Sequence, residues 1–432
     1  MNKVFFLITI AIIILAVSCN RDANNVNIEN INESISKIRK GELVIMAQPD
    51  AKITIEQLSH EFWFGCAIPN SFVGGMSENN LKQFKEKFLL NFNSAVTENA
   101  LKWMDMEKQK DEVNYNLVDS ILNWTEQNNI PIRGHNLFWG IFQSYNTGTQ
   151  YVQQWLTEIS DDELRERIKG RAETIALRYK GRFAEYDLNN EMIHGNYYED
   201  RLGPEITKLM AEWTLNGDPD AKLWLNDYDI LIEDSPLGIG LPEYMAHIRK
   251  LLKEDVPIAG IGVQGHSHLE TFDREYLKKA LDSLAIFNLP IRVTEFNMPG
   301  MRSRFGIRPF NKGIRMTNKQ EKLKAKEIAD FYRICFAHPA VEGIIMWGFW
   351  EGANWIPASS LYKRNWTPLP ALDAYRNLVF NEWWTQESGT ADSDGSFSTR
   401  AFYGLYKISV DGIQREVKLS KEIRKTIVDF RE

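Results

Sequence analysis

Two glutamates, Glu191 and Glu295, are the residues of this sequence best suited by type and position to do chemistry. Each ends an apolar segment, residues 186–191 and residues 290–295, of the kind that forms a buried strand. Because functional side chains in barrel enzymes stand at strand ends, both carboxyl groups are expected where a ligand can reach them. Two such groups are the minimum apparatus for cleaving a glycosidic bond.

Size and composition are those of an ordinary soluble globular protein. The chain has 432 residues, of which 44% are hydrophobic and 25% are charged, so it can bury one large core or two modest ones. A net charge of −7 without a basic block argues against a nucleic-acid-binding protein. The 13 tryptophans fit either a buried core or flat platforms for sugar rings, and both readings stay open here.

The cysteines do not form a metal-binding pattern. Cys66 and Cys335 lie in apolar segments and are predicted to be buried free thiols rather than a disulfide. No CxxC pair or Cys/His ligand spacing occurs, so neither a metal site nor a cofactor is expected.

The N-terminus has the pattern of an export signal. Residues 1–18 begin with Lys3, continue as an apolar run and end in small residues before Cys19, which resembles a bacterial lipoprotein box. The run is short for a spanning helix, which needs ~20 residues. Lipidation of Cys19 is therefore favoured over a cleaved signal with an incidental cysteine or an uncleaved anchor. Residues 19–36 are predicted to form a flexible tether. With a lipid on Cys19, the protein is predicted to be a membrane-anchored lipoprotein of the periplasm or cell surface.

Residues 62–381 alternate short apolar strands with helical stretches, which predicts parallel βα units. An α/β fold of the TIM (β/α)8 barrel type follows. A doubly wound sheet is the alternative, but no glycine-rich phosphate turn follows the first strand. The strands are expected near residues 62–67, 92–97, 131–136, 183–190, 221–226, 257–264, 290–295 and 343–349. The helices are expected near 78–90, 116–128, 161–179, 204–216, 243–254, 274–287 and 318–337.

The segments that flank the barrel are expected to form a small β addition. Residues 37–61 alternate apolar and polar side chains on both sides of a turn, which predicts a β-hairpin. Residues 382–432 are predicted to form a C-terminal β extension, with a hairpin turn at Asp411 and Gly412, packed with the N-terminal hairpin.

Polar and aromatic residues gather at the predicted strand ends, where a TIM barrel carries its functional face. Carboxylates, amides, imidazoles and indoles together suit a carbohydrate cleft, since they pair with hydroxyl groups and cover the apolar faces of sugar rings. These residues are Glu98, Asn99, Lys102, His135, Asn136, Trp139, Asn190, Glu191, Asn226, Asp227, Tyr228, Gln264, His266, His268, Glu295, Asn297 and Trp347.

Five segments together resemble glycoside hydrolase family 10, whose members are mostly endo-β-1,4-xylanases. They are residues 97–103, 133–139, 187–191, 262–266 and 293–295, in the family's order, within a resemblance that runs from about residue 60 to residue 380. Residues 194–203 and 402–406 look closer to the plant-like bacterial branch of that family.

The resemblance implies a role for each residue that matches a motif. Glu191 would be the general acid/base, which needs a raised pKa, and Glu295 the nucleophile, oriented by His266 and Asn297. Asn190 would bind the 2-hydroxyl group of the sugar at the cleavage site. The remaining contacts with substrate would come from Glu98, Asn99, Lys102, His135, Trp139, Tyr228, Gln264, His266, Trp347 and Trp355.

Some positions depart from the family pattern or invite a structural reading. Gly140 and Phe142 stand where the family usually has histidine and glutamine, and Gln143 is a candidate substitute. Asn297 stands where an acid is common. Asp187 is expected mainly to satisfy a buried network, and His194 and His268 are expected to be loop histidines without a role.

The function predicted from these residues is a retaining endo-β-1,4-xylanase that acts on xylan or xylo-oligosaccharides. Two alternatives remain at this stage. One is a relative that cleaves another β-linked xyloside or glucoside, because the third-strand loop departs from the pattern. The other is a non-catalytic glycan-binding lipoprotein on the same barrel. The sequence indicates no nucleic-acid partner and leaves the oligomeric state open.

Overall fold

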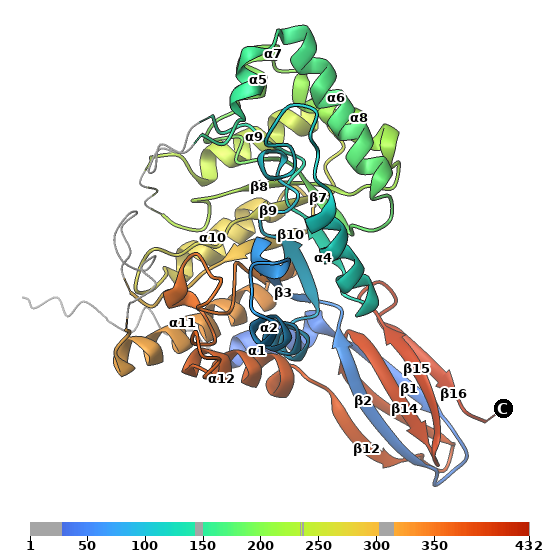
Figure 1. Ribbon diagram of the computed structural model, residues 1–432. Coiled ribbons are helices and arrows are strands. Elements are labelled where there is room, and N and C mark those ends of the chain that lie inside the picture. Colours follow the sequence, from blue (N-terminus) through green and yellow to red (C-terminus); the bar gives the residue numbers. More distant parts are fainter. Residues whose placement is uncertain (1–27, 143–149, 234, 236, 302–314, 432) are drawn as a thin grey trace, which may run out of the picture.

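The computed structural model describes residues 28–142, 150–233, 235, 237–301 and 315–431. Its larger part is a closed barrel of eight parallel strands (Figure 1). Pairing between β5 and β7 closes the barrel, and a short strand β6 (Phe138–Trp139) adds to β7. The barrel strands are β3 (Trp63–Ile68), β4 (Ser94–Thr97), β5 (Ile132–Gly134), β7 (Glu185–Asn190), β8 (Leu223–Asp227), β9 (Gly260–Val263), β10 (Ile291–Phe296) and β11 (Val341–Met346). The predicted TIM barrel is thus confirmed.

Helices cover the outside of this barrel, with apolar faces turned toward the strands. Ser160 and Thr317 begin two of them, because each side chain accepts the backbone N–H three residues on, at Glu163 and Gln320. The long helices are α2 (Glu78–Asn91), α4 (Asn116–Gln127), α6 (Asp161–Arg178), α8 (Ile206–Gly217), α9 (Leu241–Lys253), α10 (Arg274–Ala285), α11 (Asn318–Phe336) and α12 (Pro370–Asn377). Short helices α3 (Trp103–Met106), α5 (Gln154–Glu158) and α7 (Tyr197–Leu202) lie in the loops near the site.

The β addition is a two-sheet sandwich beside the barrel (Figure 1). One sheet has the order β13-β1-β16 and the other the order β12-β2-β14-β15. The turn at Asp411 and Gly412 joins β14 to β15 as predicted, with Val410 opposite Ile413. The strands are β1 (Lys40–Met46), β2 (Lys52–His60), β12 (Gln386–Thr390), β13 (Ser396–Phe402), β14 (Gly404–Val410), β15 (Ile413–Leu419) and β16 (Lys425–Asp429).

The N-terminal hairpin expected for residues 37–61 is wrong in its pairing. Both strands form, but β1 pairs with β13 and β16, whereas β2 pairs with β12 and β14. The buried side chains of β1 and β2, such as Leu43 and Ile53, belong to one core between the two sheets. Alternating apolar residues are required equally by neighbours in one sheet and by strands facing each other across a sandwich, so the pattern could not separate the two arrangements.

The flexible tether expected for residues 19–36 is also wrong from residue 28 onward. Residues Ile28–Arg39 form helix α1, and Ile35 is buried against the barrel core. At its end, Arg39 donates hydrogen bonds to the carbonyl group of Phe336, the last residue of α11, and to those of His338 and Val341, which follow this helix. Helix α1 is therefore fixed to the barrel through Arg39 and precedes the first strand of the sandwich.

The cysteines and the helices bear on three further predictions. Cys66 and Cys335 are free and buried, as predicted. Within the described ranges, none of the helices is both long and apolar enough to cross a membrane. The predicted export signal, Cys19 and Gln143 lie outside the described residues.

Candidate active site

A cavity of about 450 Å³ opens at the C-terminal ends of the barrel strands. Each residue predicted to be catalytic or to bind substrate lines it except Asn190, which is buried. Four other residues expected at the rim are also buried and do not line the cavity, namely Asn136, Asn226, Asp227 and Asn297. Residues that the sequence did not single out also contribute, namely Met104, Asp105, Ile141, Tyr151, Asp229 and Leu237. They lie in the segments that follow the strands, where the sequence has no repeating pattern, so no sequence signal located them.

Glu295, the next-to-last residue of β10, is stabilised in its ionised form. Its Oε1 accepts a hydrogen bond from Asn226 Nδ2 at 2.9 Å, and its Oε2 lies 3.0 Å from His266 Nε2. Burial alone would raise the pKa of Glu295, but His135, the hydrogen bond with His266 and Lys102 outweigh it and lower the pKa to about 2. This carboxyl group is therefore ionised near neutral pH.

Glu191, directly after β7, has the opposite tendency. Its Oε1 accepts a hydrogen bond from Gln264 Nε2 at 2.8 Å, and its Oε2 accepts one from Trp139 Nε1 at 2.9 Å. Burial first, and then the negative charge of Glu295, raise the pKa of Glu191 to about 7. Two carboxyl groups in one cavity thus differ in their protonation state, which is the arrangement of an acid and a nucleophile.

The backbone at Glu191 explains how a strand residue can face the cavity. Its φ of 61° lies in the left-handed region, which is unusual for a residue with a side chain. The backbone N–H of Glu191 donates to the carbonyl group of Asn226 at 2.8 Å, which fixes this sharp turn at the end of β7. Strain of this kind is typical of functional sites.

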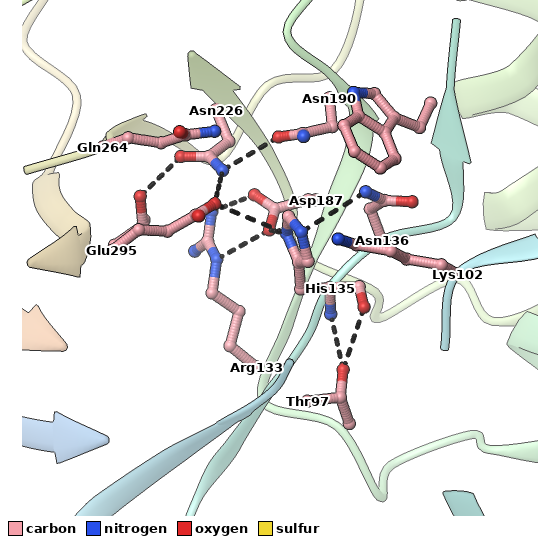
Figure 2. A network of polar contacts seen from close by, with 12 residues as sticks. Thr97, Lys102, Arg133, His135, Asn136, Asp187, Asn190, Asn226, Gln264 and Glu295 are labelled. Atoms are coloured by element: carbon pink, nitrogen blue, oxygen red, sulfur yellow. Dashed lines mark hydrogen bonds and ion pairs between the residues drawn. The ribbon is translucent and has the colours of Figure 1, made fainter. Parts of the chain in front are cut away.

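Asn226, at the end of β8, links the two halves of the site (Figure 2). Its Nδ2 donates both to Glu295 Oε1 and to Asn190 Oδ1, each at 2.9 Å, and its Oδ1 accepts from the hydroxyl group of Thr294. The amide orientation is thereby fixed, and the Nδ2 of Asn190 is left buried without a partner among the described residues. The sequence placed Asn226 at the rim but did not give it a role.

A buried ionic network lies below the cavity. Arg133 forms ion pairs with Glu185 and Asp187. Asp187 Oδ2 also lies 2.8 Å from His135 Nδ1, and Figure 2 shows Arg133, Asp187 and His135 together. Asp187 is 1% exposed and does not line the cavity, which agrees with the buried network expected for it. Because the carboxylate binds Nδ1, it holds the His135 ring beside Glu295, at 3.9 Å between Nδ1 and Oε1.

Lys102 and Asn99 stand next to each other on one wall, where Lys102 Nζ donates to Asn99 Oδ1 at 2.8 Å. Glu98 lines the same part of the cavity. Burial raises the pKa of Glu98 to about 7, although Lys102 opposes this, and the charge of Glu295 adds to it. Three residues predicted to contact the substrate are therefore brought together on one wall.

Asn297 acts on the site differently from the expectation. No hydrogen bond joins it to Glu295 in the described chain; instead its Oδ1 lies 2.7 Å from His266 Nδ1 and accepts from Trp355 Nε1 at 3.0 Å. It therefore fixes His266, and His266 in turn contacts the carboxylate. A direct role for Asn297 in orienting Glu295 is wrong.

His194 and His268 lie closer to the site than expected. The His194 ring stacks on Tyr228 with a centroid distance of 3.6 Å, and its Nδ1 lies 2.7 Å from Asp227 Oδ1. His268 lines the cavity. His194 thus backs the aromatic ring of Tyr228, whereas the sequence predicted no role for either histidine.

The third-strand loop carries Gly140 and Phe142, two positions predicted to depart from the family pattern. Phe142 does not line the cavity but stacks on Tyr197 with a centroid distance of 5.7 Å, and Ile141 faces the cavity instead. Gly140 is packed so tightly that an added Cβ would lie 3.1 Å from the backbone nitrogen of Tyr197. Ile141 therefore gives this wall an apolar side chain.

Comparison with known proteins places these features in context. The model of glycosyl hydrolase family 10 matches residues 55–378. The chain is 32% identical over 391 residues to anti-sigma-I factor RsgI6 of Acetivibrio thermocellus, covering 89% of this chain and 46% of that protein. It is also 32% identical over 391 residues to endo-1,4-beta-xylanase 1 of Arabidopsis thaliana, covering 89% and 38%. The chain thus spans less than half the length of these relatives.

Among solved structures, native xylanase 10B from Thermotoga maritima is similar to this chain with a TM-score of 0.63 and 23% identity. The alignment covers 74% of this chain and 96% of that one. At this identity the likeness supports the barrel fold.

Proposed function

The chain belongs to glycosyl hydrolase family 10, and on that premise we propose that it is a retaining endo-β-1,4-xylanase. The observation that carries the proposal is the pair of opposite pKa shifts in one cavity. Glu191 has a pKa raised to about 7, whereas the pKa of Glu295 is lowered to about 2. A double displacement needs one protonated and one ionised carboxyl group on the two sides of the glycosidic bond.

In the first step, the Glu295 carboxylate attacks the anomeric carbon, and Glu191 donates its proton to the leaving oxygen. The glycosidic bond breaks, a glycosyl ester forms on Glu295, and Glu191 becomes a carboxylate. Because the ester carries no charge, the repulsion that helped to raise the pKa of Glu191 disappears. Glu191 can then remove a proton from water, which attacks the anomeric carbon and releases Glu295.

Asn190 and Asn226 support this step from below the sugar ring. The Nδ2 of Asn190 has no protein partner among the described residues, and a buried donor of this kind favours a ligand oxygen. We assign it to the 2-hydroxyl group of the sugar at the cleavage site, a contact that strengthens in the transition state. Asn226 fixes both this amide and Glu295 through one Nδ2 group.

Xylan or xylo-oligosaccharides are the proposed substrates. Several relatives are named endo-1,4-beta-xylanases, and one solved relative, from Thermotoga petrophila, is described in complex with xylobiose. The similarity to Arabidopsis enzymes supports the plant-like branch. Ile141 rather than Phe142 faces the cavity. The second candidate function is therefore hydrolysis of another β-linked xyloside or glucoside.

A non-catalytic glycan-binding role is the remaining alternative. The relative from Acetivibrio thermocellus is named an anti-sigma-I factor. In this chain both glutamates and the groups that tune them are present, which favours catalysis.

Product analysis on xylan, mixed-linkage glucan and aryl β-xylosides tests the proposal. We expect xylan to be cut internally, with a fall in viscosity that precedes the release of short xylo-oligosaccharides. Preference for glucan or for short xylosides would support the second candidate. Binding to xylan without any product, under conditions where a known xylanase is active, would overturn the proposal.

For localisation, we propose that the mature chain is exported and anchored to a membrane by a lipid on Cys19. The lipoprotein-like sequence before Cys19 supports this. Cys19→Ser is expected to move the protein from the membrane fraction to the soluble fraction of cells after export. Unchanged sedimentation with membranes would reject the anchor, and an unprocessed, larger product would instead indicate that the variant blocks signal cleavage.

A further inference from the structure

Tyr151 is a cavity residue that belongs to none of the five family-like motifs, yet it packs directly on one of them. Its ring stacks on Trp139 with a centroid distance of 4.1 Å and an interplanar angle of 21°. The ammonium group of Lys102 lies 4.4 Å from the Trp139 ring centroid. Since the tyrosine ring occupies one face of the indole, the cation must occupy the other, so the indole is held between two neighbours.

The indole held in this way has one polar contact that matters for chemistry. Trp139 Nε1 donates to Glu191 Oε2 at 2.9 Å, while Gln264 Nε2 donates to Oε1 at 2.8 Å. Two donors on the two oxygens fix the plane of the carboxyl group. That plane decides in which direction the acid presents its proton, because proton transfer needs a heavy-atom approach of ≈ 2.6–3.2 Å.

Tyr151 is held in place by its own backbone hydrogen bond and by the two residues that follow it. Val152 is 1% exposed in the barrel core, and Gln153 Nε2 donates to the carbonyl group of Glu107. The backbone N–H of Tyr151 donates to the carbonyl group of Phe142 at 3.2 Å. These contacts hold the Tyr151 ring against Trp139.

We infer that Tyr151 is a positioning residue for the general acid: it holds the Trp139 indole against Lys102 and thereby aims the indole N–H at Glu191. The inference rests on the proposed function of Glu191. It adds a residue outside the family-like motifs and predicts that part of the acid catalysis in this chain depends on the departing loop.

A series of aryl β-xylobiosides that differ only in the leaving phenol tests the inference. A phenyl leaving group needs the proton of Glu191, whereas 2,4-dinitrophenol leaves without it. Tyr151→Ala is expected to lower kcat/KM for the phenyl substrate about 10-fold or more and that for the dinitrophenyl substrate less than about threefold. Tyr151→Phe keeps the stacked ring and is expected to retain both activities.

Phe142→Ala is the matched control, because it removes an aromatic ring from the same loop that contacts Tyr197 rather than Trp139. It should leave both substrates unaffected. If Tyr151→Ala unfolds, as judged by thermal denaturation, Tyr151→Leu keeps most of the volume without the flat ring and serves in its place.

The outcomes separate cleanly. Equal losses on both substrates would show that Tyr151 binds sugar or maintains the fold, and unchanged kinetics would show that the indole is held without it; either result overturns the inference alone. A wild-type protein that cleaves neither xylobioside would overturn the proposed function first.

Discussion

Glu295→Ala is expected to abolish turnover of xylosides, with a loss of about 10⁴-fold or more in kcat. The variant removes the group that attacks the anomeric carbon, and the other catalytic carboxyl group, Glu191, cannot replace it from the other side of the bond. Sodium azide should restore turnover of an activated aryl xyloside, because the small anion enters the space left by the side chain and attacks from the same face. The product is expected to be the α-xylosyl azide, with inverted configuration, as measured by NMR.

Glu98→Ala is the matched control for this experiment. It also removes a carboxyl group from the cavity wall, so it tests whether any new space admits azide. We expect weaker binding of xylo-oligosaccharides and no azide product. An absence of rescue in Glu295→Ala, or an equal rescue in Glu98→Ala, would remove the nucleophile assignment.

The barrel and the pair of glutamates were predictable because the physics behind them is local. Strands such as β10 are buried on both faces, so they appear in the sequence as short apolar runs between helical stretches. In a closed parallel barrel the ends of all strands meet at one rim. A carboxylate at the end of such a run, as at Glu191 and Glu295, could therefore be placed near its counterpart without coordinates.

What the sequence could not provide depends on contacts between distant segments. The alternating residues of β1 and β2 fit a hairpin as well as two facing sheets, and only strands contributed by the C-terminus decide between them. Asn226 gained its role from two partners on other strands, Asn190 and Glu295. Tyr151 follows a loop without periodicity, and its stacking on Trp139 is a matter of three-dimensional packing.

The sequence predicted the raised pKa of Glu191 but not its cause, and it predicted no pKa shift for Glu295. A raised pKa for Glu191 followed from the acid role, whereas the structure attributes it to burial first and to Glu295 second. For Glu295, burial is overcome by His135 and by His266, whose ring is fixed by Asn297. The negative charge of Glu295 is thus supported by His135 and His266, and these two rings are held in turn by Asp187 and Asn297.

The pH dependence of the wild-type enzyme follows from these shifts. The first step requires protonated Glu191, whose folded pKa is raised to about 7. As the pH rises through this value the acid loses its proton, so kcat/KM for unactivated substrates should fall about tenfold per pH unit on the alkaline side. Glu295 remains ionised throughout, because its pKa of about 2 lies far below this range.

Glu191→Ala should remove this alkaline limb and reveal what the acid contributes. For xylan and phenyl xylobioside we expect a loss of about 10²–10⁴-fold in kcat/KM, the usual contribution of general acid catalysis. For a dinitrophenyl xylobioside the first step needs no proton, so the glycosyl ester should accumulate and give a burst of phenol. Azide should then attack this ester on the face that water uses and yield the β-xylosyl azide, with retained configuration. That product is opposite to the one expected from Glu295→Ala.

Glu98→Gln distinguishes Glu191 from the other carboxyl group whose pKa is raised to about 7. The amide keeps the size and polarity of the side chain but cannot titrate, so the alkaline limb should persist in this variant if Glu191 is its source. Equal losses on activated and unactivated substrates in Glu191→Ala, or an alkaline limb that vanishes only in Glu98→Gln, would contradict the acid role. The two azide products, measured side by side, then assign each glutamate to one face of the sugar without relying on the pH profile.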